Sequence, residues 1–505
     1  MDSTELVRSR EALEAIAELM AREIRGQRGV VSRYTRVIID QAMFINGQKS
    51  AHAYCNSVLN KEMMVDGVYN VAFIDDLLPH NFDDISVARD LHKSQFKFNC
   101  KGIALPVGKQ VRFESVPLHP EFYDEEFRQF TKAHKNTRLS RTLSVEQKIV
   151  VNSDGGIAIQ SIPFFGINYG AGYQPIPVHR DIEVVCNTDD EIKKMPALIQ
   201  HLSDPTPGKI IRKAKSFSDA FHELHKISGL KFGSIEDAGF PLSSLYDVVV
   251  LTGVPAHEIF GHHFEEPIRL LEYGESGTFK MGQEGLNANG VVLSDDPSKL
   301  VEGFRTRGFT YFDAYGRIRM PQIHIKDGKV AGFLGSEYAD SENLGSFLRV
   351  QNSEFVGNAS QHTDGQFPQP RMSCTVMDGP STDIDLEGKL IIVPFEGHTN
   401  PTDKTYMVKA QECYVIINGV PKRIIPLQVT GGINQALTNL VLLNDSCYNT
   451  GMCGKPEPIY YPNSRGVGQV PVAQFCKTQL WRGQQVYPLP ISDVHLKILT
   501  GAKEN

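Results

Sequence analysis

A short run of the chain combines two imidazoles with a carboxylate and could hold a metal ion: His257-Glu258-Ile259-Phe260-Gly261-His262. A metal-dependent hydrolase needs neutral imidazoles as ligands, an open coordination position for water and a carboxylate near that water. Pro255 suits a first helical turn, because its missing N–H would be unpaired there, and Pro267 limits the far end. We therefore expect one short helix to carry both histidines and the glutamate.

The spacing of these histidines differs from that of H-E-x-x-H, the familiar helical zinc motif. There the two histidines are four residues apart and lie about 40° apart around the helix. His257 and His262 are five residues apart, which a regular helix places about 140° apart. A local π-bulge would bring the two rings together, and Gly261 lies where such a distortion is tolerated. The alternative to metal binding is that these side chains are exposed polar residues, or that the histidines are buried in a core with their hydrogen bonds satisfied.

The apolar neighbours of the run favour a buried site over a solvated face. They are Val254, Ile259, Phe260 and Phe264. A second pair, His222 and His225, lies in a helical pattern over 216–228, and we assign it to the solvated side of that helix.

Periodicity and turn signals predict the elements around the run. Helices are expected at 9–25, 120–135, 188–202 and 216–228. Hairpins are expected at Ser153-Asp154-Gly155-Gly156, Asp327-Gly328 and Asn418-Gly419. The predicted fold class is α+β: a mixed N-terminal α/β region, then a largely antiparallel β C-terminal domain that carries the active-site helix. The expected domains are 1–110, 111–240 and 241–505.

Length and composition set wider limits. A chain of 505 residues is too long to form a single hydrophobic core, so more than one domain is expected. Its 41% apolar and 22% charged residues are typical of a globular protein. A net charge of -7 without a basic stripe predicts no nucleic-acid partner. Eight scattered cysteines, an N-terminus without an apolar stretch and the lack of a long apolar run predict a cytoplasmic protein with no membrane partner.

Several segments together resemble the TldD/PmbA metallopeptidase family, and the H-E-x-x-x-H run resembles its TldD-type member. The matching segments are His257 to His262, Arg307 to Gly316, the hairpin 323–334, Gln369-Pro370-Arg371-Met372-Ser373 and Gly451-Met452-Cys453-Gly454-Lys455. Residues 245–475 carry most of the likeness, 140–230 less, and 1–110 least.

The resemblance implies a zinc ion bound by His257, His262 and Cys453, with Glu258 as the general base. Two histidines and a thiolate leave a fourth position open for water. Cys447 is a rival thiolate, but the glycines that flank Cys453 favour the latter. His263 is a rival for His262, and we assign it to packing or to support of the ligands.

The family reading implies hydrolysis of unfolded or short peptides, including modified-peptide precursors, in an enclosed site. It also implies a homodimer, or a heterodimer with a PmbA-like paralogue. The chain departs from the family after its cysteine loop, where Pro456 to Arg465 is an additional segment. Two rival functions are a non-catalytic partner subunit of such a peptidase and a metal hydrolase of non-peptide amides or esters.

Overall fold

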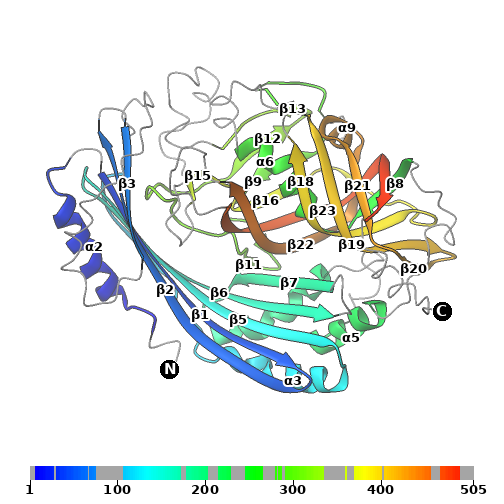
Figure 1. The fold of residues 1–505 in the computed structure, drawn as a ribbon, viewed down its shortest axis with the longest axis horizontal. Coiled ribbons are helices and arrows are strands. Elements are labelled where there is room, and N and C mark those ends of the chain that lie inside the picture. Colours follow the sequence, from blue (N-terminus) through cyan, green and yellow to red (C-terminus); the bar gives the residue numbers. More distant parts are fainter. Residues whose placement is uncertain are drawn as a thin grey trace, which may run out of the picture.

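A computed structural model gives the fold of the chain (Figure 1). The structure describes residues 6–27, 30–65, 68–75, 106–171, 178–202, 214–228, 245–265, 279–280, 282–286, 290–334, 359–360, 369–400, 403–456 and 467–489.

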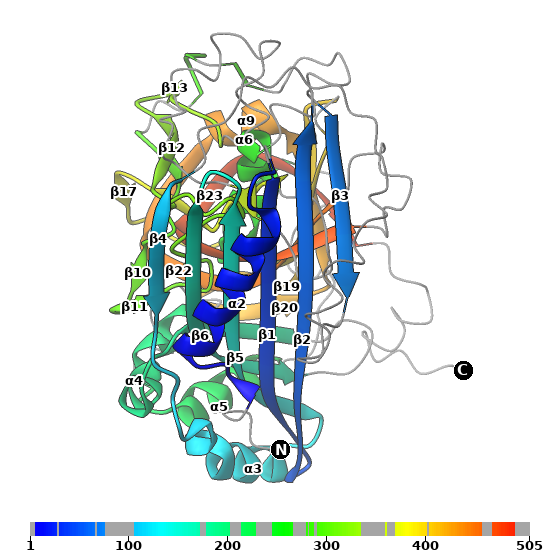
Figure 2. The same ribbon diagram turned by 90° about the vertical axis from the view of Figure 1, so that its left-hand side faces the viewer.

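A long, curved sheet forms the N-terminal part of the described chain (Figures 1 and 2). Its strands are β1 (Val30–Ile45), β2 (Gln48–Val65), β3 (Val68–Asp75), β4 (Gly108–Phe113), β5 (Thr137–Asn152), β6 (Gly156–Ala171) and β7 (Val178–Val185). The order is β3-β2-β1-β5-β6-β4, and β7 also pairs with β6. The β5–β6 hairpin turns at 153–155, as its Asp-Gly signal predicts.

Helix α2 (Arg10–Ile24) lies across one face of this sheet (Figure 2). Ser9 caps it by accepting a hydrogen bond from the backbone N–H of Ala12. Apolar residues three and four apart bury one stripe of the helix against the strands, where side chains of alternating residues face it. The buried helix residues are Leu13, Ile16, Ala17, Met20 and Ile24.

Further helices cover the lower end of the sheet in Figure 1. They are η2 (Pro120–Tyr123), α3 (Asp124–Ala133), α4 (Asp189–Lys194), η3 (Met195–His201) and α5 (Phe217–Ser228). Thr188 caps α4 by accepting from the backbone N–H of Glu191, as the predicted capping box requires. Pro196 falls at the start of η3, where the regular helix gives way to 3₁₀ winding.

A second, twelve-stranded sheet forms the C-terminal part of the described chain. Its main path is β13-β12-β9-β16-β23-β21-β19-β18-β8, and β17, β20 and β22 attach to it. These strands are β8 (Leu245–Val250), β9 (Val292–Asp295), β12 (Gln322–Lys326), β13 (Lys329–Val330), β16 (Cys374–Asp378), β17 (Ser381–Thr382), β18 (Leu390–Asn400), β19 (Thr405–Ile417), β20 (Val420–Ile424), β21 (Leu427–Gly432), β22 (Leu440–Pro456) and β23 (Val467–Pro488). Most of its pairs are antiparallel, so the predicted α+β class is confirmed.

Short elements complete the described fold. They are η5 (Ala256–Gly261), α6 (His262–Glu265), α9 (Ile433–Thr438), the strand pair β10 (Leu300–Val301) and β11 (Phe304–Arg305), and the pair β14 (Ala359–Ser360) and β15 (Gln369–Pro370). No helix of the described residues is both long and apolar enough to cross a membrane.

The two sheets contact one another through buried and half-buried polar groups. Arg307, which follows β11, forms ion pairs with Glu146 on β5 (2.6 Å) and Glu183 on β7 (2.9 Å). Arg180 on β7 pairs with Glu412 on β19, and both side chains are buried. These pairs fix the N-terminal sheet against the C-terminal sheet at the place where β7 approaches β22.

The expected domain limits lie at residues 110 and 240, and each can be placed relative to the strands of the two sheets. A limit at residue 110 falls inside β4, within one continuous sheet that spans residues 30–185. A limit at 240 lies outside the described residues, between α5 and β8.

Candidate metal centre

The run His257 to His262 leaves β8 and winds as a π-helix, η5, before continuing as α6. The backbone N–H of His262 donates to the carbonyl oxygen of His257, a bond that spans five residues. This winding brings the two imidazole rings to one side, with 4.9 Å between their centroids. The distortion expected from the five-residue spacing is therefore present.

Gly261 is needed here for space. A Cβ at this position would lie 2.7 Å from Sδ of Met372, so any larger residue would force the Met372 side chain to move away from the π-helix. Ile259 and Phe260 face the opposite way into the C-terminal core, where the Phe260 ring meets that of Trp481 at 6.0 Å. The apolar residues of the run thus anchor the helix and leave its polar residues facing the site.

Four side chains converge at the end of the π-helix: His257, Glu258, His262 and Cys453. One ligand atom from each lies within 4.8 Å of the ligand atoms of the others. Nε2 of His262 is 3.3 Å from Sγ of Cys453 and 3.1 Å from Oε2 of Glu258. Nε2 of His257 is 4.0 Å from Oε1 of Glu258.

Cys453 reaches the centre from β22, far along the sequence. It is 1% exposed and stands opposite Val470 of β23. Cys447, the rival thiolate, lies on the same strand opposite Cys476, and its Sγ donates to the Cys476 carbonyl oxygen at 3.3 Å. Cys447 therefore lies outside the group of four.

Hydrogen bonds define which nitrogen of each imidazole faces the centre. The hydroxyl of Thr375 donates to Sδ of Met372 (3.0 Å), so its oxygen accepts from Nδ1 of His257 (2.8 Å). Glu265 accepts from Nδ1 of His262 (2.8 Å). In both rings an acceptor therefore occupies Nδ1, which leaves Nε2 as the nitrogen that faces the centre.

Arg371 links Cys453 on β22 to Glu265 on α6. Its Nη2 donates to the carbonyl oxygen of Cys453 (2.9 Å), and its Nε lies 3.7 Å from Oε1 of Glu265. The same Glu265 oxygen accepts from the backbone N–H of Met372 at 2.5 Å. All of these groups are buried, so a fixed cation lies beside the thiol and both carboxylates.

Electrostatics inside the centre favour ionised acids. Burial raises the pKa of Glu258, but the charge of His262 outweighs it and brings the value to about 2. Burial likewise raises the pKa of Cys453, while His262, His257 and Arg371 lower it to about 6. Burial alone raises the pKa of Cys447 to about 12. The two thiols thus differ strongly in acidity.

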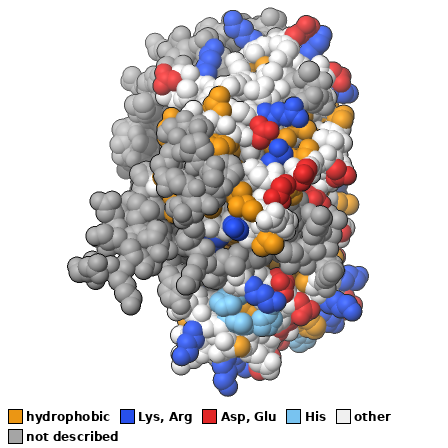
Figure 3. Space-filling view, turned by 90° about the vertical axis from the view of Figure 1, so that its right-hand side faces the viewer, with side chains coloured by type: hydrophobic (Ala, Val, Ile, Leu, Met, Phe, Trp, Pro, Cys, Tyr) orange, Lys and Arg blue, Asp and Glu red, His pale blue; other side chains and the backbone are white. Residues whose placement is uncertain are grey.

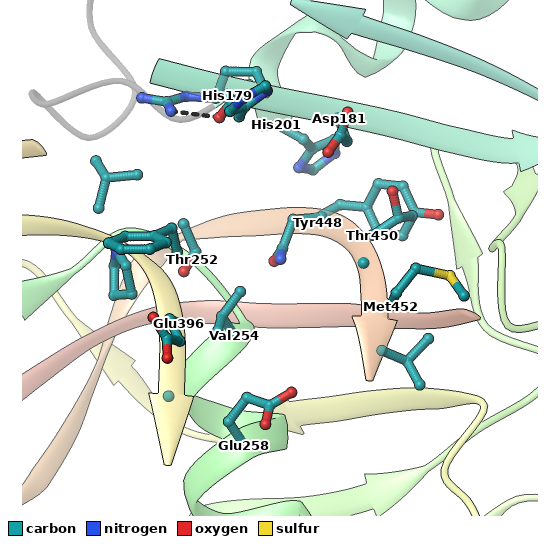
Figure 4. A pocket seen from close by; sticks show the side chains of 18 of the residues that line it. His179, Asp181, His201, Thr252, Val254, Glu258, Glu396, Tyr448, Thr450 and Met452 are labelled. Atoms are coloured by element: carbon teal, nitrogen blue, oxygen red, sulfur yellow. Dashed lines mark hydrogen bonds between the residues drawn. The ribbon is translucent and has the colours of Figure 1, made fainter. Parts of the chain in front are cut away.

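A cavity of about 530 Å³ opens beside Glu258 (Figure 4). Glu258 and Val254 line one side, and His179, Asp181 and His201 line the opposite side. The remaining wall comes from β18 (Val393 to His398) and β22 (Tyr448 to Met452). The cavity therefore lies between the two sheets, and its size suits a small ligand or a segment of peptide.

The other histidine candidates lie elsewhere. His263 is buried with its ring edge-on to Phe279 (5.5 Å) and is not one of the four convergent groups. His222 and His225 are half-buried rather than solvated, because both rings pack on His134 at the end of α3, at 4.6 and 4.5 Å. Figure 3 shows histidine side chains gathered on the lower part of the right-hand face.

Sequence reasoning missed three supporting residues. Glu265 stands three residues after His262, a helical spacing that could have indicated the contact. Arg371 lies in the segment 369–373, which the family resemblance includes, but the resemblance assigns no role to it. Thr375 is 118 residues from His257 and gives no local signal.

Comparison with known proteins identifies relatives of this chain. Residues 246–468 match the family model described as the PmbA/TldA metallopeptidase C-terminal domain. The C-terminal part of the chain therefore belongs to the TldD/PmbA family. No curated protein matches this family member significantly.

Solved structures share the fold of this TldD/PmbA protein along nearly its whole length. TldE from Thermococcus kodakarensis has a TM-score of 0.60 and 12% identity, covering 94% of this chain and 100% of its own. A proposed modulator of DNA gyrase from Thermotoga maritima has a TM-score of 0.57 and 13% identity, covering 95% of this chain and 100% of its own. Another proposed modulator, from Bacteroides thetaiotaomicron, has a TM-score of 0.60 and 13% identity, covering 96% of this chain and 100% of its own. At such identities the likeness concerns the fold.

Proposed function

We propose that this chain is a zinc-dependent peptidase of the TldD type that hydrolyses unfolded or short peptides, including modified-peptide precursors. The observation that carries the proposal is the convergence of two Nε2 atoms and one thiol beside Glu258, at the edge of a cavity. His257, His262 and Cys453 would hold the metal, and Glu258 would act as the general base.

The donor set fits a zinc ion. Ligand atoms of one zinc ion lie at most about 4.5 Å apart, given bonds of about 2.0 to 2.3 Å, and the group of four is close to that span. Nε2 of His257 is buried and has no hydrogen-bond partner among the described residues, as expected for a ligand atom. Imidazole nitrogen and thiolate sulfur are both zinc ligands, and three protein ligands leave a fourth position for water in catalytic zinc sites.

Charge balance supports a divalent ion. Among the described residues of the centre, Glu258, Glu265 and the Cys453 thiolate are negative and Arg371 is positive. A divalent cation would neutralise the remaining charge, which buried groups require. Without it, protons compensate: burial lowers the pKa of His262, but the Cys453 thiolate and both carboxylates raise it well above its usual value.

The chain's own residues supply the acid–base steps. A bound zinc ion provides Lewis-acid activation of water and of the scissile carbonyl. Glu258, ionised at neutral pH, accepts the proton of the attacking water and then delivers it to the leaving amine. The cavity walls from β7, β18 and β22 hold the peptide beside this carboxylate.

A second candidate is a cysteine hydrolase without metal. Cys453, His262 and Glu265 have the geometry of a nucleophile, a base and an orienting acid, at 3.3 and 2.8 Å. Against it, the Cys453 side chain is 1% exposed, whereas Glu258 lines the cavity and has no role in that chemistry. The metal proposal gives a role to each of the four convergent residues, His257, Glu258, His262 and Cys453.

Digestion of an unstructured peptide pool by the purified chain tests the proposal. We expect cleavage that a chelator abolishes and that added Zn²⁺ restores. Cleavage that resists the chelator but is blocked by thiol alkylation would favour the cysteine hydrolase. Cleavage of amide or ester compounds with intact peptides would favour a non-peptide hydrolase, and inactivity toward both would favour a partner subunit.

We further propose a dimeric, cytoplasmic enzyme, a homodimer or a heterodimer with a PmbA-like paralogue. Family resemblance supports this assembly. Light scattering at working concentration should give twice the mass of 56.2 kDa for the homodimer. An active monomer would contradict the proposal.

A further inference from the structure

The two candidate ligand histidines are each held by a different kind of buried side chain. Glu265, a carboxylate, holds His262, whereas Thr375, a hydroxyl, holds His257. Glu265 is 1% exposed and Thr375 is 0% exposed, so water does not compete for either contact. Each contact therefore controls ring orientation and tautomer directly.

Both holding residues are themselves fixed by the segment 371–375. The backbone N–H of Met372 donates to Glu265 (2.5 Å), and Sδ of Met372 accepts from Thr375 (3.0 Å). Asp295 in turn fixes the segment by accepting from the backbone N–H groups of Ser373 (2.7 Å) and Cys374 (2.9 Å). One short stretch of chain thus connects the supports of both imidazoles.

We propose that Glu265 and Thr375 are the positioning residues of the centre, and that they act unequally on its two imidazoles. This inference rests on the proposed function. Thr375 donates its hydroxyl hydrogen to Sδ of Met372, so its oxygen accepts from Nδ1 of His257. This contact leaves Nε2 of His257 as the nitrogen available to a metal. Glu265 does the same for His262 with a charged acceptor, so it makes that imidazole the stronger electron donor.

Removal of each support has a defined consequence. In Thr375→Val the shape of the side chain is kept, but Nδ1–H of His257 loses its acceptor and the ring is free to change tautomer. In Glu265→Gln the charge is lost while the size is kept. Loss of a partner of this kind typically weakens metal binding about 10- to 100-fold. We expect the larger loss in Glu265→Gln, since its hydrogen bond is charged.

Titration of the metal-stripped full-length chain with Co²⁺ tests the proposal, because Co²⁺ reports its ligands in its visible spectrum. The variants are Thr375→Val, Thr375→Ser, Glu265→Gln and, as a matched control on exposed β17, Thr382→Val. We expect wild-type-like affinity and spectrum in the control and in Thr375→Ser, which restores the hydroxyl. Thr375→Val and Glu265→Gln should bind about 10- to 100-fold more weakly, with altered visible bands.

The outcomes separate this inference from the proposed function. Wild-type affinity and spectrum in both Thr375→Val and Glu265→Gln would overturn the positioning roles and leave the metal centre intact. A wild-type chain that binds neither Co²⁺ nor Zn²⁺ would overturn the proposed function itself. If Glu265→Gln fails to fold, the comparison of Thr375→Val with Thr375→Ser still decides the role of the hydroxyl.

Discussion

Gly397 lies against Glu258 so closely that a Cβ on the glycine would be 2.8 Å from Cβ of the glutamate. Such a distance is far inside van der Waals contact, so β18 can approach the π-helix only with a glycine at this point. The position of the candidate general base is therefore coupled to a strand that lines the cavity.

Gly397→Ala should displace Glu258 and lower kcat for peptide hydrolysis about 100-fold, because a displacement of about 1 Å has effects of that size. Zinc content should stay near one ion per chain, since the metal ligands lie on other residues. Steady-state kinetics and elemental analysis measure both quantities. Gly432→Ala is the matched control, because its new methyl meets only Gln435 at 3.9 Å. Unchanged kcat in Gly397→Ala would contradict the coupling.

Glu258→Gln should preserve fold and zinc content while lowering turnover by about 100- to 10,000-fold, because an amide cannot accept the proton of water. Peptide digestion with metal analysis checks this. Hydrolysis at the wild-type rate would show that another group is the base.

Cys453 should be protected while metal is bound and alkylated once metal is removed, at a rate limited by its burial. Its pKa, about 6 despite burial because of the nearby imidazoles and Arg371, makes the thiolate abundant at pH 7. Cys447, with a pKa raised to about 12 by burial, should stay unmodified in either state. Mass spectrometry with and without chelator measures both sites.

The matched serine variants extend this test. Cys453→Ser should weaken zinc binding strongly, since a hydroxyl is a poorer zinc ligand than a thiolate, and Cys447→Ser should leave it unchanged. Protection of Cys447 in place of Cys453 would reverse the assignment of the third ligand.

His324 should make the fold less stable in mild acid. Burial lowers its pKa to about 4, although Gly332 and Glu265 raise it, so its ring is neutral in the folded chain. An unfolded histidine has a pKa of about 6.5, so the unfolded state takes up a proton as pH falls below that value. The stabilisation is thus complete above pH 6.5 and is lost between pH 6.5 and 4.

From pH 7 to pH 5 this loss is about 2 kcal/mol in the free energy of unfolding. Urea titrations of the metal-free chain at both pH values measure it, and His324→Gln should lose about 2 kcal/mol less between them. Metal-free protein is used so that metal release does not contribute. An equal pH dependence in the variant would show that His324 titrates normally in the fold.

The sequence predicted features that depend on local spacing. The five-residue interval between His257 and His262 required π-winding, and Asp-Gly and Asn-Gly pairs located hairpins that the structure contains. The α+β class followed from the same local signals. Each of these features is encoded within about ten residues, which is why a single sequence reveals it.

Long-range pairing was not predictable in this way. The pairs between β1 and β5 join residues about a hundred positions apart, so nothing local marked 30–185 as one sheet. Thr375 illustrates the same limit at the site, because an ordinary strand threonine carries no sign of its distant histidine partner. By contrast, Glu265 lies one helical turn from its partner and was within reach of the pattern.

The π-helix also has an evolutionary consequence. A π-turn amounts to one residue inserted into an α-helix, so η5 and the helix of an H-E-x-x-H enzyme differ by a single-residue indel. Both present two imidazoles on one side, but one extra residue rotates the chain that follows it by about 100° relative to the chain before it. Gly261 and Met372 pack together in the π-wound form, where a Cβ on the glycine would lie 2.7 Å from Sδ of Met372. A single deletion would restore the shorter histidine spacing, but it would also shift Gly261 relative to Met372, so the packing around the helix would have to change with it.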